Sequence, residues 1–325
     1  MQSQVSFSQS EFSEKKKVTR REKFLDAMEL VVPWVQLVAI ISPFYPKGER
    51  GRPPIGIERM LRIYFLQQWY SLSDELIEET IYDSLAMRIF TGIDLSIESV
   101  PDATTLLKFR RLLETHGLTK QIFEEVKVLL QKHNMLLQEG TIIDATIIGA
   151  PSSTKNKSKA RDPEMHQTRK GEQCYFGMKS HIGVDTASGM VHSLEGTAAN
   201  EADITQAHAL LTGKEEVVFA DAGYIGVEKR EEVIQVAPNV EWQIAAKRGK
   251  IKAMPEGLLK ELYQKLESTK ASVRAKVEHP FHVLKNLFGY RMVRYRGLAK
   301  NIAQQYTLFA LVNLFMGRKV LLGNL

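Results

Sequence analysis

The 325-residue chain has one cysteine, Cys174, so it cannot form a disulfide within itself. A chain of this length with one cysteine is typical of a reducing compartment. Long apolar runs are also lacking, because the stretch at 30–45 is short and is split by Pro33, which favours a buried helix over a membrane span. The basic stretch at 13–24 leads into no continuous apolar segment, so it is not predicted to be a signal peptide. These absences predict a cytoplasmic protein that has no membrane partner.

Acidic side chains are scarce in the C-terminal part of the chain. Between Ser268 and Leu325 the one carboxylate side chain is Glu278, among ten Lys and Arg residues. Residues 241–300 hold fourteen Lys and Arg against five Asp and Glu, and the basic run at 153–161 contains no acid. The whole chain has a formal net charge of +6 and a pI near 9.1. One charge run is usually a solvated face, but two on a basic chain favour a polyanionic partner.

The hydrophobic pattern divides the chain into three parts. Residues 1–20 are polar and basic, and we expect a mobile tail. Residues 21–136 carry apolar side chains at every third or fourth position, which predicts a helical domain. In residues 137–325, β-branched strands alternate with helices, beginning with TIIDATII at 141–148. This order predicts an α/β domain in which helices cover a mixed five-stranded sheet.

Local signals predict some details of that domain. A Ser-, Lys- and Asn-rich loop is expected at 151–173. Asn200, with Asp203 three residues later, predicts a capped α-helix over NEADITQAHALL. Pro280 cannot donate a backbone hydrogen bond, so it predicts a kink or a restart of its helix near Glu278.

Two aspartates stand out in the predicted strands. Asp144 is the one charge in an apolar strand, and Asp221 lies where an apolar strand ends and Gly223 permits a turn. An unpaired carboxylate in a buried strand is costly, so each aspartate needs a partner or a cation. An ion pair to a nearby lysine, or a cap on the following turn, explains either aspartate equally well.

Glu278 is the third carboxylate of interest. On a helix, Arg274, His282 and Lys285 share its face, although a salt-bridged surface gives the same pattern. Two strand-end aspartates and a helical glutamate would form an oxygen-rich site that suits Mg²⁺. Two such ions can activate the attacking oxygen and stabilise the leaving oxygen of a phosphodiester. Arg274 and Lys285 would then hold phosphates.

The chain resembles bacterial insertion-sequence transposases with an Asp-Asp-Glu active site, in the group typified by insertion sequence five. The resemblance covers nearly the whole chain and is most specific at RAKVEHPFHVLK, which fits the family signature at Arg274, Glu278 and Lys285. The tyrosine expected three residues before the arginine is replaced by Ala271, which bears on the phosphate contact that this tyrosine would make.

The segments IIDATII and ADAGYIG are similar to the two aspartate motifs of that family, so the resemblance assigns Asp144 and Asp221, with Glu278, as catalytic and metal-binding residues. It implies a ribonuclease H-like catalytic domain after an all-α, DNA-binding N-terminal domain. It also implies that two Mg²⁺ ions, with Mn²⁺ as a substitute, serve to cut the element's 3′ ends and join them to target DNA. The implied partners are the double-stranded DNA of the terminal inverted repeats and of the target, bound by a homo-oligomer that is nucleoid-associated on DNA.

Further basic side chains are candidates for contact with DNA phosphates. Lys179 and His181 alternate onto one face of the strand beside that of Asp144, where they would approach the reacting phosphate. A satisfied sheet histidine explains His181 equally well. Lys247 and Arg248 follow a predicted strand, where a solvated loop is the alternative to DNA contact.

Recognition of the element ends is assigned to the N-terminal region. Arg50 and Arg52 in RGRPP resemble a minor-groove arginine hook, although five residues also fit a plain loop. Lys108, Arg110 and Arg111 lie on a predicted helix that either reads the terminal repeats or packs against its neighbours.

Three functions follow from these patterns. The leading one is a DNA transposase. A catalytically silent DNA-binding protein derived from such an element is the first alternative, and the presence of all three carboxylates with the Arg and Lys pair argues against it. A plain metal-dependent nuclease is the second.

Overall fold

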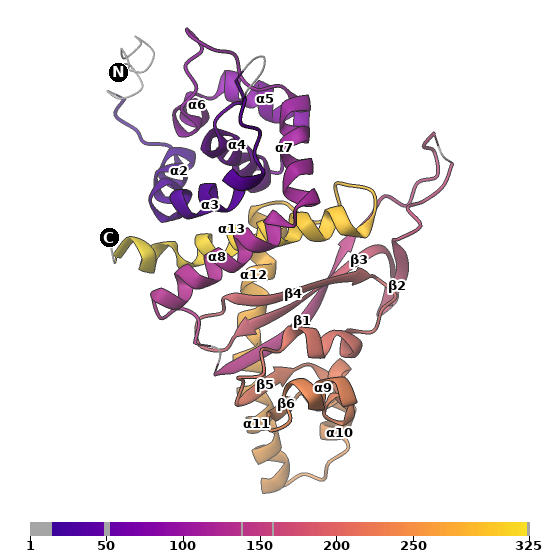
Figure 1. The fold of residues 1–325 in the computed structure, drawn as a ribbon. Coiled ribbons are helices and arrows are strands. Elements are labelled where there is room, and N and C mark those ends of the chain that lie inside the picture. Colours follow the sequence, from indigo (N-terminus) through magenta and orange to yellow (C-terminus); the bar gives the residue numbers. More distant parts are fainter. Residues whose placement is uncertain (1–14, 49–52, 138, 158, 324–325) are drawn as a thin grey trace. The chain divides into compact units, whose positions relative to one another are not determined.

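A computed structural model describes residues 15–48, 53–137, 139–157 and 159–323 (Figure 1). The chain divides into two compact units. The first comprises Met1–Glu125 together with Gly317–Leu325, and the second comprises Val126–Met316.

The first unit is helical in its described residues. Its α-helices are α2 Arg20–Val31, α3 Trp34–Ile41, α4 Ile57–Trp69, α5 Asp74–Asp83, α6 Leu85–Thr91 and α7 Ala103–Thr115. The Asp102 carboxylate accepts a hydrogen bond from the Thr105 N–H at 2.8 Å and so caps the start of α7. Helix α4 is buried over most of its length, and its Trp69 packs edge to face against Phe90 with the ring centroids 5.8 Å apart. This aromatic core holds the unit together.

A mixed sheet forms the centre of the second unit. Its strands are β1 Gly140–Gly149, β2 His166–Lys170, β3 Gln173–Asp185, β4 Val191–Ala198, β5 Val217–Ala220 and β6 Glu241–Ile244. The strand order is β2-β3-β1-β5-β6, and β4 also pairs with β3. Strand β1 is antiparallel to β3 and parallel to β5. The predicted helical region followed by an α/β domain is therefore confirmed.

The described residues form six strands where the sequence pattern predicts five. The additional strand, β2, lies inside the expected loop at 151–173 and pairs antiparallel with the first part of β3. Its side chains are almost all exposed, so it has no apolar alternation by which a sequence pattern would reveal it.

The predicted capped helix at NEADITQAHALL is instead a 3₁₀ helix, η2 Asp203–Leu210. Ala202 is its N-cap and supplies no side-chain hydrogen bond, so the expected capping role of Asn200 is wrong. The Asp203 carboxylate is engaged elsewhere, since its Oδ1 lies 2.9 Å from Nζ of Lys179.

The helices of the second unit follow the strands. They are α9 Glu231–Val236, α10 Arg248–Lys252, α11 Leu258–Arg274 and α12 Glu278–His282, while α8 Leu118–Lys132 and α13 Leu298–Gly323 each run across a boundary between the units. A 3₁₀ turn, η5 Ala275–Val277, precedes Glu278, and a π-helical turn, η6 Val283–Leu287, follows α12. The break predicted from Pro280 is therefore present. Helix α13 is long and apolar enough to cross a membrane, but 56% of its apolar window is buried inside the protein, as in a core helix.

Alternation along β1 gives its two faces different surroundings. Ile143 belongs to a buried cluster with Ala207 and Leu210 of η2 and with Tyr224, which covers one face of the sheet. Asp144 and Thr146 lie on the other face, where Lys285 of η6 reaches Thr146. The aspartate and the segment that follows Glu278 therefore lie on the same face of the sheet.

Candidate active site

The two aspartates lie on neighbouring parallel strands. Ile142 of β1 pairs with Phe219 of β5, so two residues further along each strand Asp144 and Asp221 reach equivalent positions. Asp221 follows directly after β5, and its Oδ1 accepts a hydrogen bond from the Gly223 N–H at 2.8 Å. Asp221 therefore caps the 3₁₀ turn η3 (Ala222–Tyr224), one of the structural roles that the sequence left open.

Glu278 begins α12 and is exposed, and it lies 57 positions after Asp221 and 134 positions after Asp144 in the sequence.

 The charges of Asp221 and Glu278 nevertheless affect Asp144. The pKa of Asp144 is raised to about 6, mainly because the side chain is buried and further because Asp221 and Glu278 are negatively charged. A hydrogen bond from the Ala145 N–H and the charge of Arg274 oppose this rise. The fold therefore brings three carboxylates that are far apart in the sequence near enough for the charges of two of them to affect Asp144.

The donor set fits a hard divalent cation in its chemistry. It consists of carboxylate oxygens, and a bound cation would offset the charges of Asp221 and Glu278, which add to the effect of burial on the pKa of Asp144. In this conformation, however, no three His, Cys, Asp or Glu side chains among the described residues lie close enough together to hold a metal ion. The carboxylates thus interact through space at distances longer than shared coordination, and they would have to draw closer around a cation.

Lys285 contacts the strand that carries Asp144. Its Nζ donates hydrogen bonds to Thr146 Oγ1 at 2.6 Å and to the Ile147 carbonyl oxygen at 2.8 Å. Burial lowers the pKa of Lys285, and the nearby cations Lys170 and Arg291 lower it further. Lys285 therefore fastens η6 to β1, and phosphate binding by its ammonium group stays a prediction.

Lys179 and His181 lie on the face of the sheet opposite Asp144. His181 pairs with Ala145 and Lys179 with Ile147, and both of these β1 residues alternate with Asp144. Lys179 is ion-paired with Asp203, and the fully buried His181 shares a hydrogen bond with Thr197 at 2.8 Å. Contact with a phosphate beside Asp144 would need both side chains to leave these partners, so the arrangement favours the structural alternative for His181.

Of the predicted DNA contacts Lys247, Arg248, Arg50 and Arg52, the structure describes the side chain of Lys247. Lys247 is exposed at the N-cap of α10. The side chain of Arg248, and all of Arg50 and Arg52, lie outside the residues that the structure describes. DNA contact by these four residues stays a prediction.

The structure favours the packing alternative for Arg110. Its guanidinium is buried and makes a two-pronged ion pair with the Asp74 carboxylate, with N–O distances of 2.7 and 3.0 Å. Arg110 therefore joins α7 to α5, because a desolvated guanidinium requires a carboxylate partner. Lys108 and Arg111 on the same helix are exposed, so their side chains are accessible to DNA.

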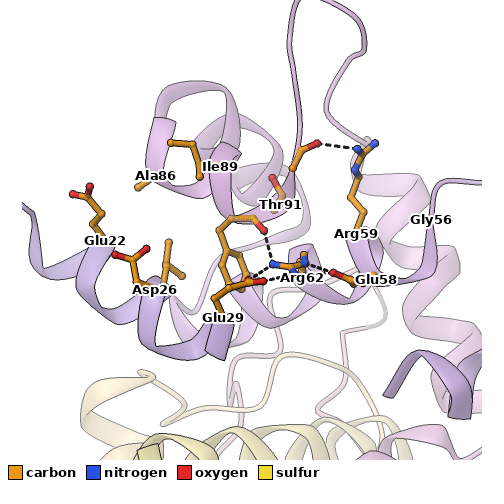
Figure 2. A pocket seen from close by; sticks show the side chains of 13 residues that line it. Glu22, Asp26, Glu29, Gly56, Glu58, Arg59, Arg62, Ala86, Ile89 and Thr91 are labelled. Carbon is orange, nitrogen blue, oxygen red and sulfur yellow. Dashed lines mark hydrogen bonds and ion pairs between the residues drawn. The ribbon is translucent and has the colours of Figure 1, made fainter. Parts of the chain in front are cut away.

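A large cavity in the first unit has the wrong charge for a phosphate (Figure 2). It has a volume of about 800 Å³, and the carboxylates of Glu22, Asp26, Glu29 and Glu58 outnumber its two arginines. Arg62 is already held there by Glu29 and Glu58, at N–O distances of 2.8 and 2.7 Å. From Glu58 to Asp102 the sequence has nine acidic residues and three basic ones. This part of the first unit therefore carries an excess of negative charge.

Two family models match the chain. Residues 136–314 match the family model described as "Transposase DDE domain", and residues 12–112 match the model described as "Transposase domain (DUF772)". The chain belongs to the DDE transposase family. The mixed sheet and helices of this transposase fit a ribonuclease H-like fold.

Two solved structures also resemble the transposase. One is the cryo-EM structure of the piggyBac transposase synaptic complex with hairpin DNA, with 10% identity, a TM-score of 0.45, and coverage of 95% of this chain and 77% of that chain. The other is the crystal structure of the Mos1 strand transfer complex, with 12% identity, a TM-score of 0.19, and coverage of 74% and 78%. These values are low, so the assignment rests on the family models.

Tyr224 is a neighbour of the site that sequence reasoning missed. Its side chain is buried, and no described residue forms a hydrogen bond with its hydroxyl group. Burial raises the pKa of Tyr224 well above its usual value, and the charges of Asp203, Asp144 and Asp221 raise it further. The position three residues after Asp221 was a signal in the sequence, but an apolar core role explains a tyrosine there equally well.

Proposed function

We propose that this chain is the transposase of an insertion sequence in the group typified by insertion sequence five. It binds the terminal inverted repeats, cleaves the 3′ ends of the element and joins them to target DNA. Family membership supports the transposase function. The observation that carries the assignment of residues is that Asp144 and Asp221 reach equivalent positions of neighbouring parallel strands within the matched DDE domain. Lys285, seven residues after Glu278, contacts the strand that carries Asp144.

Asp144, Asp221 and Glu278 would hold two Mg²⁺ ions, or Mn²⁺ in their place, which when bound stabilise charge on the attacking and leaving oxygens of the phosphodiester. Arg274, which is close enough to lower the pKa of Asp144, would hold oxygens of the reacting phosphate. Lys285 would keep β1 fixed through its bonds to Thr146 and Ile147 or exchange one of them for a phosphate oxygen. The work of the protein is thus positioning and charge stabilisation.

The test uses the full-length protein, duplexes that carry the element's own ends, a target duplex and Mg²⁺. Wild type is expected to give both cleaved ends and joined products on one gel. Asp221→Asn is expected to keep end binding and to lose both products by at least about a hundredfold, because the substitution removes one charge from the carboxylate set. Glu228→Gln, an exposed acid of the same unit, is the matched control and is expected to react like wild type.

The two alternatives predict different gels. If wild type binds the ends but never cleaves them, the chain is a catalytically silent DNA-binding protein. If cleaved ends accumulate and no joined product forms, it is a nuclease. We also propose that more than one subunit brings the ends together in the cytoplasm, and sedimentation of the protein with and without end DNA measures this.

A further inference from the structure

A second, smaller cavity lies in the catalytic unit and is basic. Its volume is about 200 Å³. Its charged lining consists of Arg161, Arg294 and Arg296 against one acid, Asp162. The Asp162 carboxylate is occupied by backbone N–H groups, with Gly297 N at 2.7 Å and Glu164 N at 3.1 Å. The lining therefore has a net positive charge.

The walls of this cavity are fixed by hydrogen bonds. The fully buried Asn301 accepts from the backbone N–H groups of Arg294 and Tyr295 and donates to the carbonyl oxygens of Tyr295 and Gly297. The opposite wall is held by Arg161, whose Nε donates to the Ser152 carbonyl oxygen at 2.9 Å. The site is thus pre-formed, which reduces the entropy that a ligand would lose on binding.

Arg161 is also oriented for a ligand. Its guanidinium lies over the ring of Phe176, 5.3 Å from the centroid, and no described residue accepts a hydrogen bond from its two terminal amino groups. A guanidinium that is held flat in this way presents paired donors of the spacing that phosphate oxygens accept.

The cavity is joined to the carboxylates by the backbone of β1. Gly149 at the end of β1 forms two hydrogen bonds with the 291–293 segment. Its N–H donates to the Arg291 carbonyl oxygen at 3.0 Å, and its carbonyl oxygen accepts from the Val293 N–H at 2.8 Å. Ala150, the next residue, lines the cavity. Ala150 lies six positions after Asp144, which is about 20 Å of strand at about 3.3 Å per residue. Lys285 lies along this path.

We propose that this cavity binds the DNA backbone, and that Arg161, Arg294 and Arg296 hold phosphates about six nucleotides from the reacting one, since one nucleotide of a strand advances about 3.4 Å. The inference rests on the proposed transposase function and adds a second DNA-binding site to it. The acidic cavity of the first unit has the opposite charge and does not compete for this ligand. Arginines that contact phosphates position DNA without reading its sequence.

The test measures the affinity of the full-length protein for a duplex at a series of salt concentrations. The variant Arg161→Gln/Arg294→Gln/Arg296→Gln is compared with wild type and with Lys214→Gln/Lys229→Gln, two exposed cations elsewhere in the same unit. The slope of log K against log salt is negative, and each lost phosphate contact reduces its magnitude by about 0.9. The triple variant is therefore expected to lose about 2.7 from the slope, so that raising the salt from 50 to 200 mM weakens its binding about fortyfold less than that of wild type.

Hydroxyl-radical footprinting of the same complexes locates the contact. The triple variant is expected to lose protection about six nucleotides from the cleavage position, while the control variant keeps it. An unchanged slope and footprint in the triple variant overturn the inference, and the transposase function stands if that variant cleaves and joins normally. Wild type that neither binds nor cleaves DNA overturns both. If the triple variant does not fold, Arg161→Gln and Arg296→Gln alone are each expected to lower the slope by about 0.9, and two unchanged slopes overturn the inference.

Discussion

At the scale of single residues, the environment of Asp144 sets how tightly its carboxyl group holds a proton. Burial and the charges of Asp221 and Glu278 make it hold the proton more tightly than a carboxyl group in water does. The sequence predicted this residue because a lone charge in an apolar strand is conspicuous. It did not predict the environment, because Asp221 and Glu278 come from other elements. Arg110 differs from Asp144, because nothing in the sequence of α7 indicates that its side chain is buried. Its partner Asp74 lies 36 positions away.

The raised pKa of Asp144 predicts a pH dependence of stability in the metal-free protein. Between the ordinary value near 4 and the folded value of about 6, the folded state binds more protons than the unfolded state. The stabilisation is therefore fully present below pH 4 and is lost as the pH rises through 6, by up to about 3 kcal/mol. Asp144→Asn is expected to be more stable than wild type at pH 7.5 and to approach it at pH 4. Urea unfolding at several pH values measures the difference, and a constant difference between the two proteins would contradict the account.

At the scale of elements, those with a strong local signal were predictable. Helix α7 begins at its Asp102 cap, and the helix that carries Glu278 is broken as Pro280 requires. The elements that differ have signals that other contacts override. Strand β2 is polar and forms through pairing with β3. In the first turn of η2, Asp203 forms an ion pair with Lys179 and does not cap the helix. Such partners are set by the tertiary structure.

His192 links β4 to β1 and predicts a second pH dependence. Its Nε2 lies 3.0 Å from Thr141 Oγ1, and burial lowers its pKa to about 4, although the charge of Glu215 opposes this. Between about 6.5 and 4 the unfolded chain takes up a proton that the folded protein refuses, so stability is lost as the pH falls through this window, by about 3 kcal/mol. His192→Gln is expected to abolish that loss when unfolding is compared at pH 7 and pH 4.5. The exposed His166→Gln is the control, and a wild-type pH profile in His192→Gln would refute the prediction.

At the scale of the whole molecule, charge is divided unevenly along the sequence. The stretch from Glu58 to Asp102 is acidic, whereas residues 241–300 are strongly basic. The division into a helical and an α/β part could be predicted from periodicity. The basic cavity could not, because its walls are 135 positions apart where Asp162 meets Gly297. Non-local contacts of this kind leave no periodic pattern in a sequence.

The basic segment at α10 predicts where much of the salt-sensitive DNA affinity arises. Lys247, Lys250 and Lys252 are exposed within six residues. Changing all three to Gln is expected to lower the slope of log K against log salt by up to about 2.7, because each cation that neutralises a phosphate releases counterions. Folding is expected to be unaffected, which thermal unfolding checks. A slope equal to that of wild type would remove this segment from the DNA-binding surface.

Asp144, Asp221 and Glu278 are proposed to bind a divalent cation together. This is tested most directly by titration of Mn²⁺ into the full-length protein bound to end DNA, followed by electron paramagnetic resonance of the free ion. Wild type is expected to remove up to two Mn²⁺ ions per site from solution, and Asp144→Asn and Asp221→Asn are each expected to weaken that uptake at least about tenfold. Glu228→Gln is expected to bind as wild type does. Equal uptake in wild type and in both aspartate variants would contradict the account.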